Sequence, residues 1–349
     1  MTLYKRNGKK NNGNRKRKTS KTGGRKTPAA AVVILLLMTA ILLFSEEMPN
    51  QRNGGGQAEN QEGQKNQGSR GSQESLNSDM EAGNELTVHF IDVGQGDATL
   101  LTCGGDAMLI DAGDNSQGAR LQNYLNKQGI EKLAYVIGTH PDADHIGGMD
   151  VILYKFDCET IIMPEEEKDT ASYRDVADTM KNKGYKKTLP RVGDTYRLGN
   201  AEFTILSPDR NYDGSNDNSV AIILTHGKNS FLFTGDAEEA AEADMQKNGI
   251  SLAADVYQVG HHGSRTASSL SFLEAVSPAY AVISCGEGNS YGHPHAEVLN
   301  HLRAMGTKVF RTDEQGTVTA ISNGEKITWN CAPSETWQAG EPGGYTKSG

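Results

Sequence analysis

The sequence has few cysteines, and those it has form no pattern. Cys103, Cys158, Cys285 and Cys331 are far apart in the 349 residues, and no CxxC pair occurs among them. This spacing excludes a disulfide-rich scaffold and a zinc site built from paired thiolates. The 40 glycines follow no Gly-X-Y period, which excludes a collagen-like chain. We therefore expect the four thiols to be small, buried, apolar side chains.

Acidic residues are missing from the first 26 positions, which hold eleven lysines and arginines. The rest of the chain carries 24 basic and 44 acidic side chains, a net charge of −20. A broad nucleic-acid-binding surface needs many local cations to contact phosphates, so this body does not have the composition of one. The charge balance leaves room only for a small basic groove.

One stretch, residues 28–45, is apolar and uncharged over 18 residues, the short end of what crosses a bilayer of about 30 Å. Cations precede it and Glu46 and Glu47 follow it, so the positive-inside rule places the basic segment 1–27 in the cytoplasm and the rest outside. A cleaved signal peptide, which would leave the protein secreted, is the alternative. The basic leader is long for a signal peptide and no Ala-x-Ala site follows, so we expect a single-pass membrane anchor.

The segments on either side of the central body lack the composition of a packed core. Residues 46–85 contain no aromatic side chain and are rich in Gly, Gln, Asn, Ser and Glu, so we expect a disordered linker. Residues 331–349 show no apolar periodicity and are expected to form a flexible tail. One domain over residues 86–330 remains.

Within this domain, short strand-like runs alternate with helical patterns. Three early runs separated by Gly-containing turns predict a meander of strands, and a helix that ends near Gly129 follows them. Later strands and helices alternate to the end of the domain. The order predicts an α+β fold of two sheets covered by outer helices rather than a doubly wound parallel sheet. The expected strands cover residues 86–93, 98–102, 107–113, 133–139, 201–207, 219–226, 230–236, 255–260, 279–284, 309–312, 316–322 and 326–330, and the expected helices cover 117–127, 237–247, 268–276 and 296–305.

Four potential metal ligands follow the strand expected at 133–139. His140, Asp142, Asp144 and His145 lie within six residues. One carboxylate would suffice to cap the next helix. Two imidazoles and two carboxylates in one loop instead favour a bound cation.

Three further short motifs stand at the ends of expected elements. Asp236 ends a strand, where it is placed to reach the same cleft. His261 and His262 follow another strand, and since adjacent side chains point apart, one is expected to ligate and the other to face the substrate. His293 and His295 precede a helix, where solvent-facing histidines are the alternative.

Four other polar side chains receive lesser roles. Gln95 and Asp97 are expected to line the cleft. His89 and His226 have no motif around them and are expected to be structural or surface histidines.

Taken in order, these motifs resemble those of the metallo-β-lactamase superfamily. The matching segments are His-x-Asp-x-Asp-His-x-Gly-Gly from His140, Thr-Gly-Asp at Asp236, His-His-Gly-Ser from His261 and Gly-His-Pro-His around His293, preceded by residues 90–97 and 109–113. Within the superfamily, the sequence is most similar to the hydrolase domain of the ComEC competence-protein family. The resemblance covers about residues 86–330 and implies an αββα sandwich with two divalent metal ions at one edge.

The resemblance also implies a ligand set. His140 and Asp142 would bind the first ion, Asp144 and His145 the second, and Asp236 would bridge them. His262 would complete the second site, with His261 as its alternative, and Asp111 would orient a ligand histidine.

Two positions depart from the superfamily pattern. Asp142 stands where a histidine is common, and no histidine occurs at 215–219, where the third first-site histidine is expected. The first site is therefore poor in nitrogen, and manganese becomes plausible beside zinc because oxygen ligands favour harder ions.

The implied reaction is hydrolysis by a hydroxide held between the two ions. Asp144 is expected to accept its proton, and His261 and His293 are further catalytic candidates. Ser264, Arg265 and His295 are expected to contact the substrate.

We expect a phosphodiester substrate, DNA being the choice that the resemblance favours. The acidic body keeps a small phosphodiester of the cell envelope open as well. A catalytically weak metal-binding module, motivated by the missing histidine, and β-lactam hydrolysis, disfavoured by Asp142, are the alternatives. No nucleotide-cofactor fingerprint is present in the chain, and the sequence identifies no protein partner.

Overall fold

The computed structural model describes residues 84–341. The expected basic segment 1–27, the membrane anchor 28–45 and the linker up to residue 83 lie outside the described residues, as do residues 342–349. Among the described helices, none is long and apolar enough to cross a bilayer.

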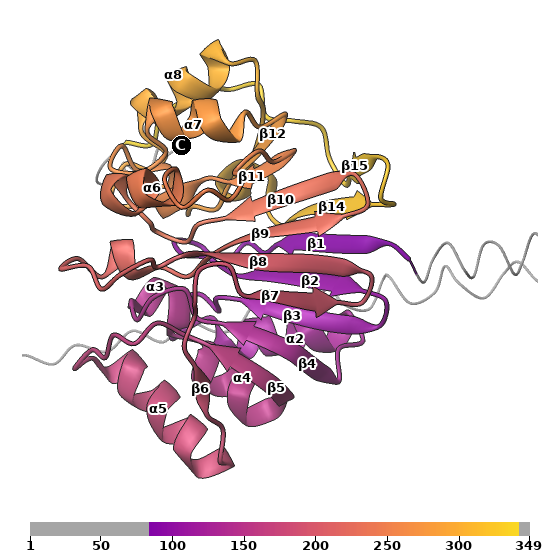
Figure 1. Cartoon of the computed structure of the whole chain (residues 1–349), viewed down its shortest axis with the longest axis vertical. Coiled ribbons are helices and arrows are strands. Elements are labelled where there is room, and N and C mark those ends of the chain that lie inside the picture. The colour runs from indigo at the N-terminus through magenta and orange to yellow at the C-terminus, as the bar shows by residue number, and fades with distance from the viewer. Residues whose placement is uncertain (1–83, 342–349) are drawn as a thin grey trace, which may run out of the picture. The chain divides into compact units, whose positions relative to one another are not determined.

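Two β-sheets form the centre of the fold (Figure 1). The first sheet has eight strands in the order β15-β14-β1-β2-β3-β4-β5-β6, and the second has seven in the order β13-β12-β11-β10-β9-β8-β7. The first sheet consists of β1 (Leu86–Phe90), β2 (Thr99–Cys103), β3 (Asp106–Ile110), β4 (Lys132–Ile137), β5 (Asp157–Ile162), β6 (Lys187–Thr188), β14 (Val318–Ser322) and β15 (Ile327–Trp329). The second consists of β7 (Thr195–Leu198), β8 (Ala201–Ser207), β9 (Ala221–His226), β10 (Asn229–Phe233), β11 (Val256–Gln258), β12 (Tyr280–Ile283) and β13 (Lys308–Arg311).

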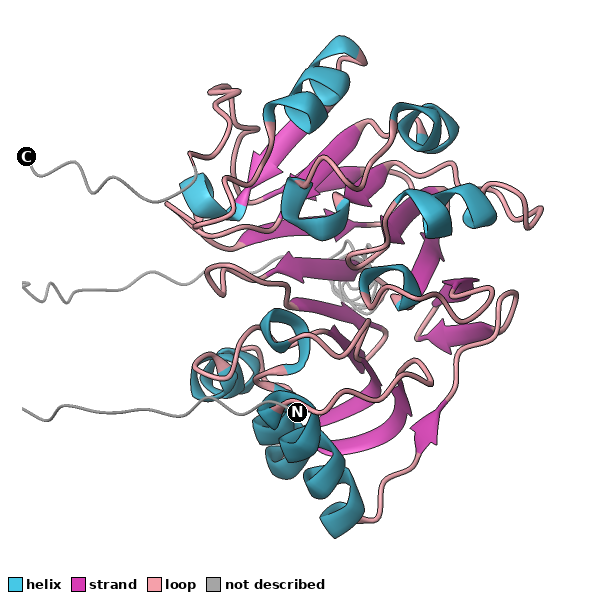
Figure 2. Cartoon of the chain, turned by 90° about the vertical axis from the view of Figure 1, so that its left-hand side faces the viewer, coloured by secondary structure: helices cyan, strands magenta, loops and turns pink. Residues whose placement is uncertain are grey.

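Helices cover the outer face of each sheet, as Figures 1 and 2 show. The first sheet is covered by α2, α4 and α5, and the second by α6, α7 and α8. Two short helices, α3 and α9, lie in the connections. The helices are α2 (Gly118–Lys127), α3 (Ala143–Ile146), α4 (Met149–Lys155), α5 (Ala171–Lys183), α6 (Glu239–Met245), α7 (Leu270–Val276), α8 (Ala296–Ala304) and α9 (Thr312–Gln315).

Alternating side chains along the strands separate three apolar layers. In β9, Ile222 and Leu224 face the first sheet, whereas Ala221 and Ile223 face the outer helices. This period of two is what a strand with both faces covered requires. The layer between the sheets is rich in aromatic rings, including Phe90 stacked on Phe233 with ring centroids 6.2 Å apart. The expected αββα sandwich is therefore confirmed.

The predicted meander is also present, since β1, β2 and β3 pair antiparallel in sequence order. The segment between residues 157 and 198, for which no element was expected, holds β5, α5, β6 and β7. Helix α5 buries only Ser172, Val176 and Met180 of its thirteen residues, so its sequence carries a weak apolar pattern.

The beginning of the expected tail packs against the second sheet. The Ser334 N–H donates to the Val309 carbonyl (2.7 Å), and the Gly340 N–H donates to the Pro294 carbonyl (2.9 Å). The indole of Trp337 packs against the layer under α8. Residues 331–341 are therefore part of the folded body, contrary to the expectation of a flexible tail from residue 331, because one aromatic side chain and backbone hydrogen bonds hold them.

Candidate metal centre

The candidate ligands all follow the carboxyl ends of strands. His140 and His145 come after β4, Asp236 after β10, and His261 and His262 after β11. β4 runs parallel to β3 and β5, and β11 lies between the parallel strands β10 and β12. Parallel strands end at the same edge of a sheet, so the topology brings these loops together near α3, at the left-hand edge of the sheets in Figure 1.

Four side chains form one buried group at this edge. Asp97, His145, Asp236 and His262 each offer a ligand atom, and these atoms all lie within 4.8 Å of one another. Each of the four residues is at most 5% exposed. Two carboxylates and two imidazoles thus converge from four separate segments of the chain.

The imidazoles point their Nε2 atoms at Asp236. His145 Nε2 lies 3.2 Å from Oδ1 of this carboxylate, and His262 Nε2 lies 3.7 Å from Oδ2. His140 and His261 approach Oδ2 with their Nε2 atoms at 3.8 and 3.6 Å. Asp236 is therefore the common neighbour of all four histidines, as expected of a bridging ligand.

The opposite ring nitrogens are held by oxygen atoms. His145 Nδ1 lies 2.8 Å from Asp111 Oδ2, and His262 Nδ1 lies 3.0 Å from the Ser284 carbonyl. His261 Nδ1 lies 3.0 Å from Glu238 Oε1. An acceptor at Nδ1 keeps one proton on that nitrogen, so Nε2 is the atom that a metal would bind in exchange for its proton, and carboxylates and carbonyls are the partners that ligand histidines use.

Burial and charge act against each other in this group. Burial disfavours the charged form of Asp236, but the charges of His145 and His262 outweigh it and hold the pKa of Asp236 well below its ordinary value. Burial and the charge of His145 lower the pKa of His140 to about 4. Asp236 is therefore ionised and His140 neutral at pH 7, which are the states a metal ligand needs.

Unpartnered polar atoms test whether the group fits a cation. The Nε2 atoms of His140, His145 and His262 and one carboxylate oxygen each of Asp97 and Asp236 are buried without a hydrogen-bond partner. Leaving such atoms unpaired in a protein interior costs free energy. A divalent ion would satisfy them together, and mixed nitrogen and oxygen ligands suit zinc or manganese. The residues present therefore fit a metal ion.

The backbone around the group is adapted to close contact. A Cβ on Gly96 (φ +141°) would lie 2.3 Å from the Asp144 carbonyl oxygen, so only glycine lets Asp97 reach the loop after β4. The Asp97 N–H then donates to that same carbonyl (3.2 Å). His261 and His262 have φ values of +50° and +56°, a conformation that histidine rarely adopts and that is often found at functional sites.

The two aspartates of the loop after β4 differ in their surroundings. Asp144 Oδ2 lies 3.4 Å from His262 Nε2, so this carboxylate borders the four-residue group. The structure does not bring Asp142 to the group: its carboxylate contacts Lys168, and Ser215 Oγ donates to it at 3.1 Å. Lys168 and Ser215 therefore hold the Asp142 carboxylate outside the four-residue group.

The structure places the remaining site candidates around His261. The buried ring of His293 lies 5.6 Å from that of His261 and 4.9 Å from that of His295. Ser264 is buried and paired with Thr266, whereas Arg265 is exposed and lies 3.6 Å from Glu297. Arg265 is therefore directed away from the four-residue group, although it lines an adjacent groove of about 640 Å³.

Sequence reasoning gave Asp97 only a place in the cleft lining and did not single out Glu238 or Lys168. Asp97 had a visible signal, since it ends the Gly-Gln-Gly-Asp turn directly before a strand. Glu238 and Lys168 carry no motif, and only the folded chain shows that they reach His261 and Asp142.

The structural histidines were correctly separated from the site. His226 is hydrogen-bonded to Ser322 Oγ and to the Asn84 carbonyl, both at 2.8 Å. His89 contacts the Tyr124 hydroxyl at 3.0 Å. His226 lies at the end of β9 that pairs with the start of β10, opposite the candidate ligands, and the ring of His89 lies against Tyr124 of α2.

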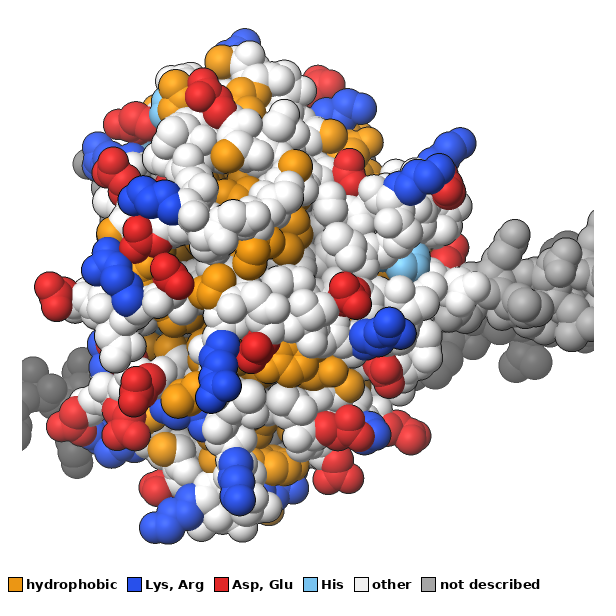
Figure 3. All heavy atoms as spheres, in the orientation of Figure 1, with side chains coloured by type: hydrophobic (Ala, Val, Ile, Leu, Met, Phe, Trp, Pro, Cys, Tyr) orange, Lys and Arg blue, Asp and Glu red, His pale blue; other side chains and the backbone are white. Residues whose placement is uncertain are grey.

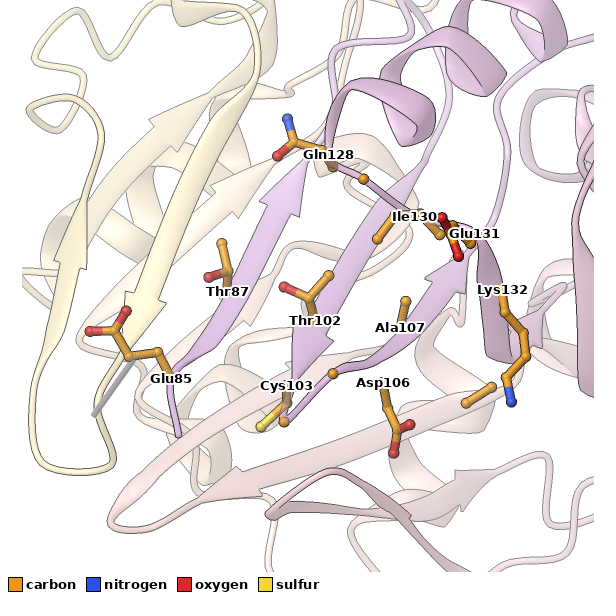
Figure 4. Close-up of a pocket in the computed structure, with 14 residues that line it drawn as sticks. Glu85, Thr87, Thr102, Cys103, Asp106, Ala107, Gln128, Ile130, Glu131 and Lys132 are labelled. Atoms are coloured by element: carbon orange, nitrogen blue, oxygen red, sulfur yellow. The ribbon is translucent and has the colours of Figure 1, made fainter. Parts of the chain in front are cut away.

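A groove of about 530 Å³ lies at the other end of the first sheet (Figure 4). Asp106, which lines it, begins β3, whereas Asp111 follows the far end of the same strand. Lys132 likewise begins β4, the strand that leads to His140. The groove is therefore separated from the candidate metal ligands by the length of the strands.

An αββα sandwich with histidine and aspartate side chains meeting at the strand ends is a metallo-hydrolase fold. The chain belongs to the metallo-β-lactamase superfamily, whose family model matches residues 91–287.

Curated relatives share this region. ComE operon protein 3 of Bacillus subtilis is 30% identical over 253 residues, covering 67% of this chain and 33% of the relative. Recombination protein 2 of Haemophilus influenzae is 34% identical over 237 residues, covering 66% and 28%, and competence protein ComA of Neisseria gonorrhoeae is 31% identical over 238 residues, covering 67% and 32%. The chain spans about a third of the length of these relatives.

Solved structures show lower similarity. The metallo-β-lactamase fold protein YhfI of Bacillus subtilis is 14% identical with a TM-score of 0.46, covering 71% of this chain and 100% of its own. The metallo hydrolase Igni18 of Ignicoccus hospitalis is 16% identical with a TM-score of 0.45, covering 67% and 98%.

Proposed function

We propose that this chain is a metal-dependent phosphodiesterase that cleaves DNA outside the cytoplasm and is anchored in the cell membrane through residues 28–45. The observation that carries the hydrolase part is the buried group of Asp97, His145, Asp236 and His262, whose ligand atoms lie within 4.8 Å of one another. The location rests on the uncharged segment and the cations before it.

The four residues of the buried group would hold zinc or manganese. His145 and His262 would supply nitrogen, and Asp97 and Asp236 oxygen. A divalent ion in such a centre activates water and neutralises charge that develops on the attacked group. The pair of ions expected from the resemblance would need a second complete ligand set beside His140.

Asp144 is the proposed proton acceptor. Burial disfavours its charged form, but His262 beside it and the charge of His145 outweigh burial and hold the pKa of Asp144 below its usual range. Its side chain is about one-third exposed, at 32%, so the carboxylate is ionised and accessible to a water molecule from the cleft.

His293 is better suited to binding than to protonating a leaving group. Burial and the charges of His262 and His261 lower its pKa to about 3, so the ring is neutral at pH 7. A neutral imidazole donates one hydrogen bond and accepts one. We propose that His293 orients a substrate oxygen, with His295 at the rim and the buried Ser264 behind it.

DNA is proposed as the phosphodiester for two reasons. One relative is named a competence protein and another a recombination protein. In addition, Tyr291 is 60% exposed, and its ring stacks on that of His293 at 5.5 Å and 20°. An exposed aromatic ring beside the centre can stack on a nucleobase, which contributes about 1–3 kcal/mol per base.

The test is cleavage by the full chain, in detergent with Mn²⁺ or Zn²⁺, of labelled single-stranded DNA and of a chromogenic phosphodiester. We expect Asp236→Asn to abolish both activities and Tyr291→Ala to weaken DNA cleavage alone. Tyr154→Ala is the matched control, since Tyr154 is 63% exposed on α4.

Each failure has a distinct meaning. If protein with bound metal cleaves neither substrate, the phosphodiesterase proposal is refuted, and the alternative of a catalytically weak metal-binding module remains. Appreciable turnover of a reporter β-lactam would replace the proposed substrate class.

A further inference from the structure

A lysine pairs with Asp142, one of the ligands expected of the first metal ion. The Lys168 ammonium contacts Oδ1 of Asp142, and Ser215 Oγ donates to the same oxygen at 3.1 Å. Asp142 was expected to be a ligand of the first ion. Its carboxylate is instead paired with a positive charge that belongs to the chain.

The segment that carries Lys168 is fixed at both sides. It connects β5 to α5, and its Glu166 accepts a hydrogen bond from Asn218 Nδ2 at 3.0 Å. Thr170 caps α5 by accepting from the Tyr173 N–H at 3.3 Å. The ammonium is therefore positioned by the fold and not only by its attraction to Asp142.

The segment 215–219, where a third nitrogen ligand was expected, is committed to other contacts. Ser215 holds Asp142, and the Asn218 amide donates to the Tyr212 carbonyl at 3.0 Å as well as to Glu166. Ser219 Oγ lies 3.3 Å from His140 Nδ1 and accepts from the Asp236 N–H at 3.1 Å. These side chains orient the loop and its neighbours, and none brings a nitrogen ligand to the cleft.

The ligands left for a first ion are too few. With Asp142 paired to Lys168, the atoms beside Asp236 Oδ2 are His140 Nε2 at 3.8 Å and His261 Nε2 at 3.6 Å, and these three side chains do not converge within 4.8 Å as the four-residue group does. Protein sites for zinc supply three or four ligands. The group of Asp97, His145, Asp236 and His262 meets this number on its own.

We propose that the Lys168 ammonium takes the place of the first metal ion, so that the centre holds one divalent ion and one lysine charge. In the part that concerns substrate, this inference rests on the proposed phosphodiesterase function. Lysine binds phosphate oxygens as a point charge. Lys168 is 34% exposed, so it can contact a phosphodiester oxygen while it remains beside Asp142.

Metal stoichiometry tests the inference without any substrate. The full chain is dialysed against Mn²⁺ or Zn²⁺ alone, and bound metal is measured. We expect one equivalent for the wild type and two for Lys168→Met, because the freed Asp142 would complete a set with His140 and Asp236. Lys168→Arg, which keeps the charge, and Lys181→Met, which removes an exposed lysine of α5, should each bind one.

Two results would overturn the inference: two equivalents in the wild type, or the same stoichiometry and affinity in Lys168→Met as in the wild type. Two equivalents in Lys168→Arg would also count against it, since the charge would then not be what excludes the ion.

A second measurement concerns the substrate. Lys168→Met saturated with metal at its first equivalent should cleave the phosphodiester at least about tenfold less efficiently, through a higher KM, and Lys168→Arg should restore part of the loss. An unchanged KM in Lys168→Met would show that Lys168 does not contact the phosphodiester. If the wild type cleaves no phosphodiester at all, the proposed function fails while the stoichiometry still decides what Lys168 does.

Discussion

Replacing Asp111 by asparagine tests whether the metal centre depends on how His145 is oriented. Asp111 is fully buried and accepts hydrogen bonds from the Thr139 N–H (2.8 Å) and the Thr139 hydroxyl (2.7 Å). Its Oδ2 also lies 2.8 Å from His145 Nδ1, which fixes a proton on that nitrogen and leaves Nε2 free for the metal.

The substitution preserves the shape of the side chain and changes the two hydrogen bonds made by Oδ2. Asp111 has φ +58°, a conformation that asparagine tolerates, so the backbone is kept. The amide oxygen can still accept from the Thr139 N–H, but the NH₂ group then faces His145 Nδ1 and the Thr139 hydroxyl, and at Nδ1 two donors meet. His145 must move its proton to Nε2, where it opposes metal binding.

Loss of such an orienting partner typically weakens metal affinity by about 10–100-fold, or about 1.4–2.7 kcal/mol. We expect a loss of this size for Asp111→Asn of the full chain in a calorimetric titration with Zn²⁺ or Mn²⁺. Asp255→Asn is a matched control, because Asp255 accepts from the N–H and hydroxyl of Ser230 (2.9 and 3.3 Å) but precedes β11 at its opposite end. Affinity within about twofold of the wild type, with the circular dichroism spectrum unchanged, would refute the reasoning.

Three other predictions follow from single features. Burial lowers the pKa of His89 to about 4, so the folded state binds fewer protons than the unfolded state, and the stability present above pH 6.5 is lost as the pH falls toward 4. Denaturant titrations should therefore show that the free energy of unfolding falls between pH 7.5 and pH 5.5 by about 1.3 kcal/mol more in the wild type than in His89→Gln. An equal fall in the two proteins would contradict this. Gly96→Ala forces a Cβ to within 2.3 Å of the Asp144 carbonyl oxygen and should weaken metal binding at least about tenfold. Gly94→Ala is the control for backbone strain, because Gly94 also has a positive φ (+74°) but nothing lies within 4 Å of its Cβ; equal affinities of the two variants would disprove the effect of the close approach. Removing the metal with a chelator should lower the free energy of unfolding by about 2.7 kcal/mol, relative to protein in metal at 100 times its Kd. Asp236→Asn should not show this difference, which checks that the metal acts at this centre.

The features that could be predicted from the sequence are those with a local pattern. Strand β9 reads as an uninterrupted apolar run, and the loop from His140 to His145 concentrates ligand types in six residues. The motifs at His140, Asp236 and His261 each followed an expected strand, and the position of the site at one edge of the sandwich came from the family resemblance.

The features that could not be predicted depend on contacts between distant residues. Asp97 reaches His262 across 165 positions, and Lys168 reaches Asp142 only because the connection between β5 and α5 folds back. Helix α5 was missed because its buried face is limited to three residues, two of them apolar. Burial and pairing of single charged side chains leave no periodic trace in a sequence, so no window of residues could reveal them.

The charge of the chain limits how a DNA substrate can be recognised. Outside its first 26 residues the chain has a net charge of −20, and on the face in Figure 3 acidic and basic side chains are interspersed. Long-range attraction of a polyanion therefore cannot come from the body, and at physiological ionic strength charges are screened beyond about 8 Å. Recognition has to be short-ranged, through groups that touch the substrate. The proposed metal ion, Lys168 and the exposed ring of Tyr291 are the groups that we propose for this contact, and they would require only a phosphodiester with a base beside it rather than a long duplex.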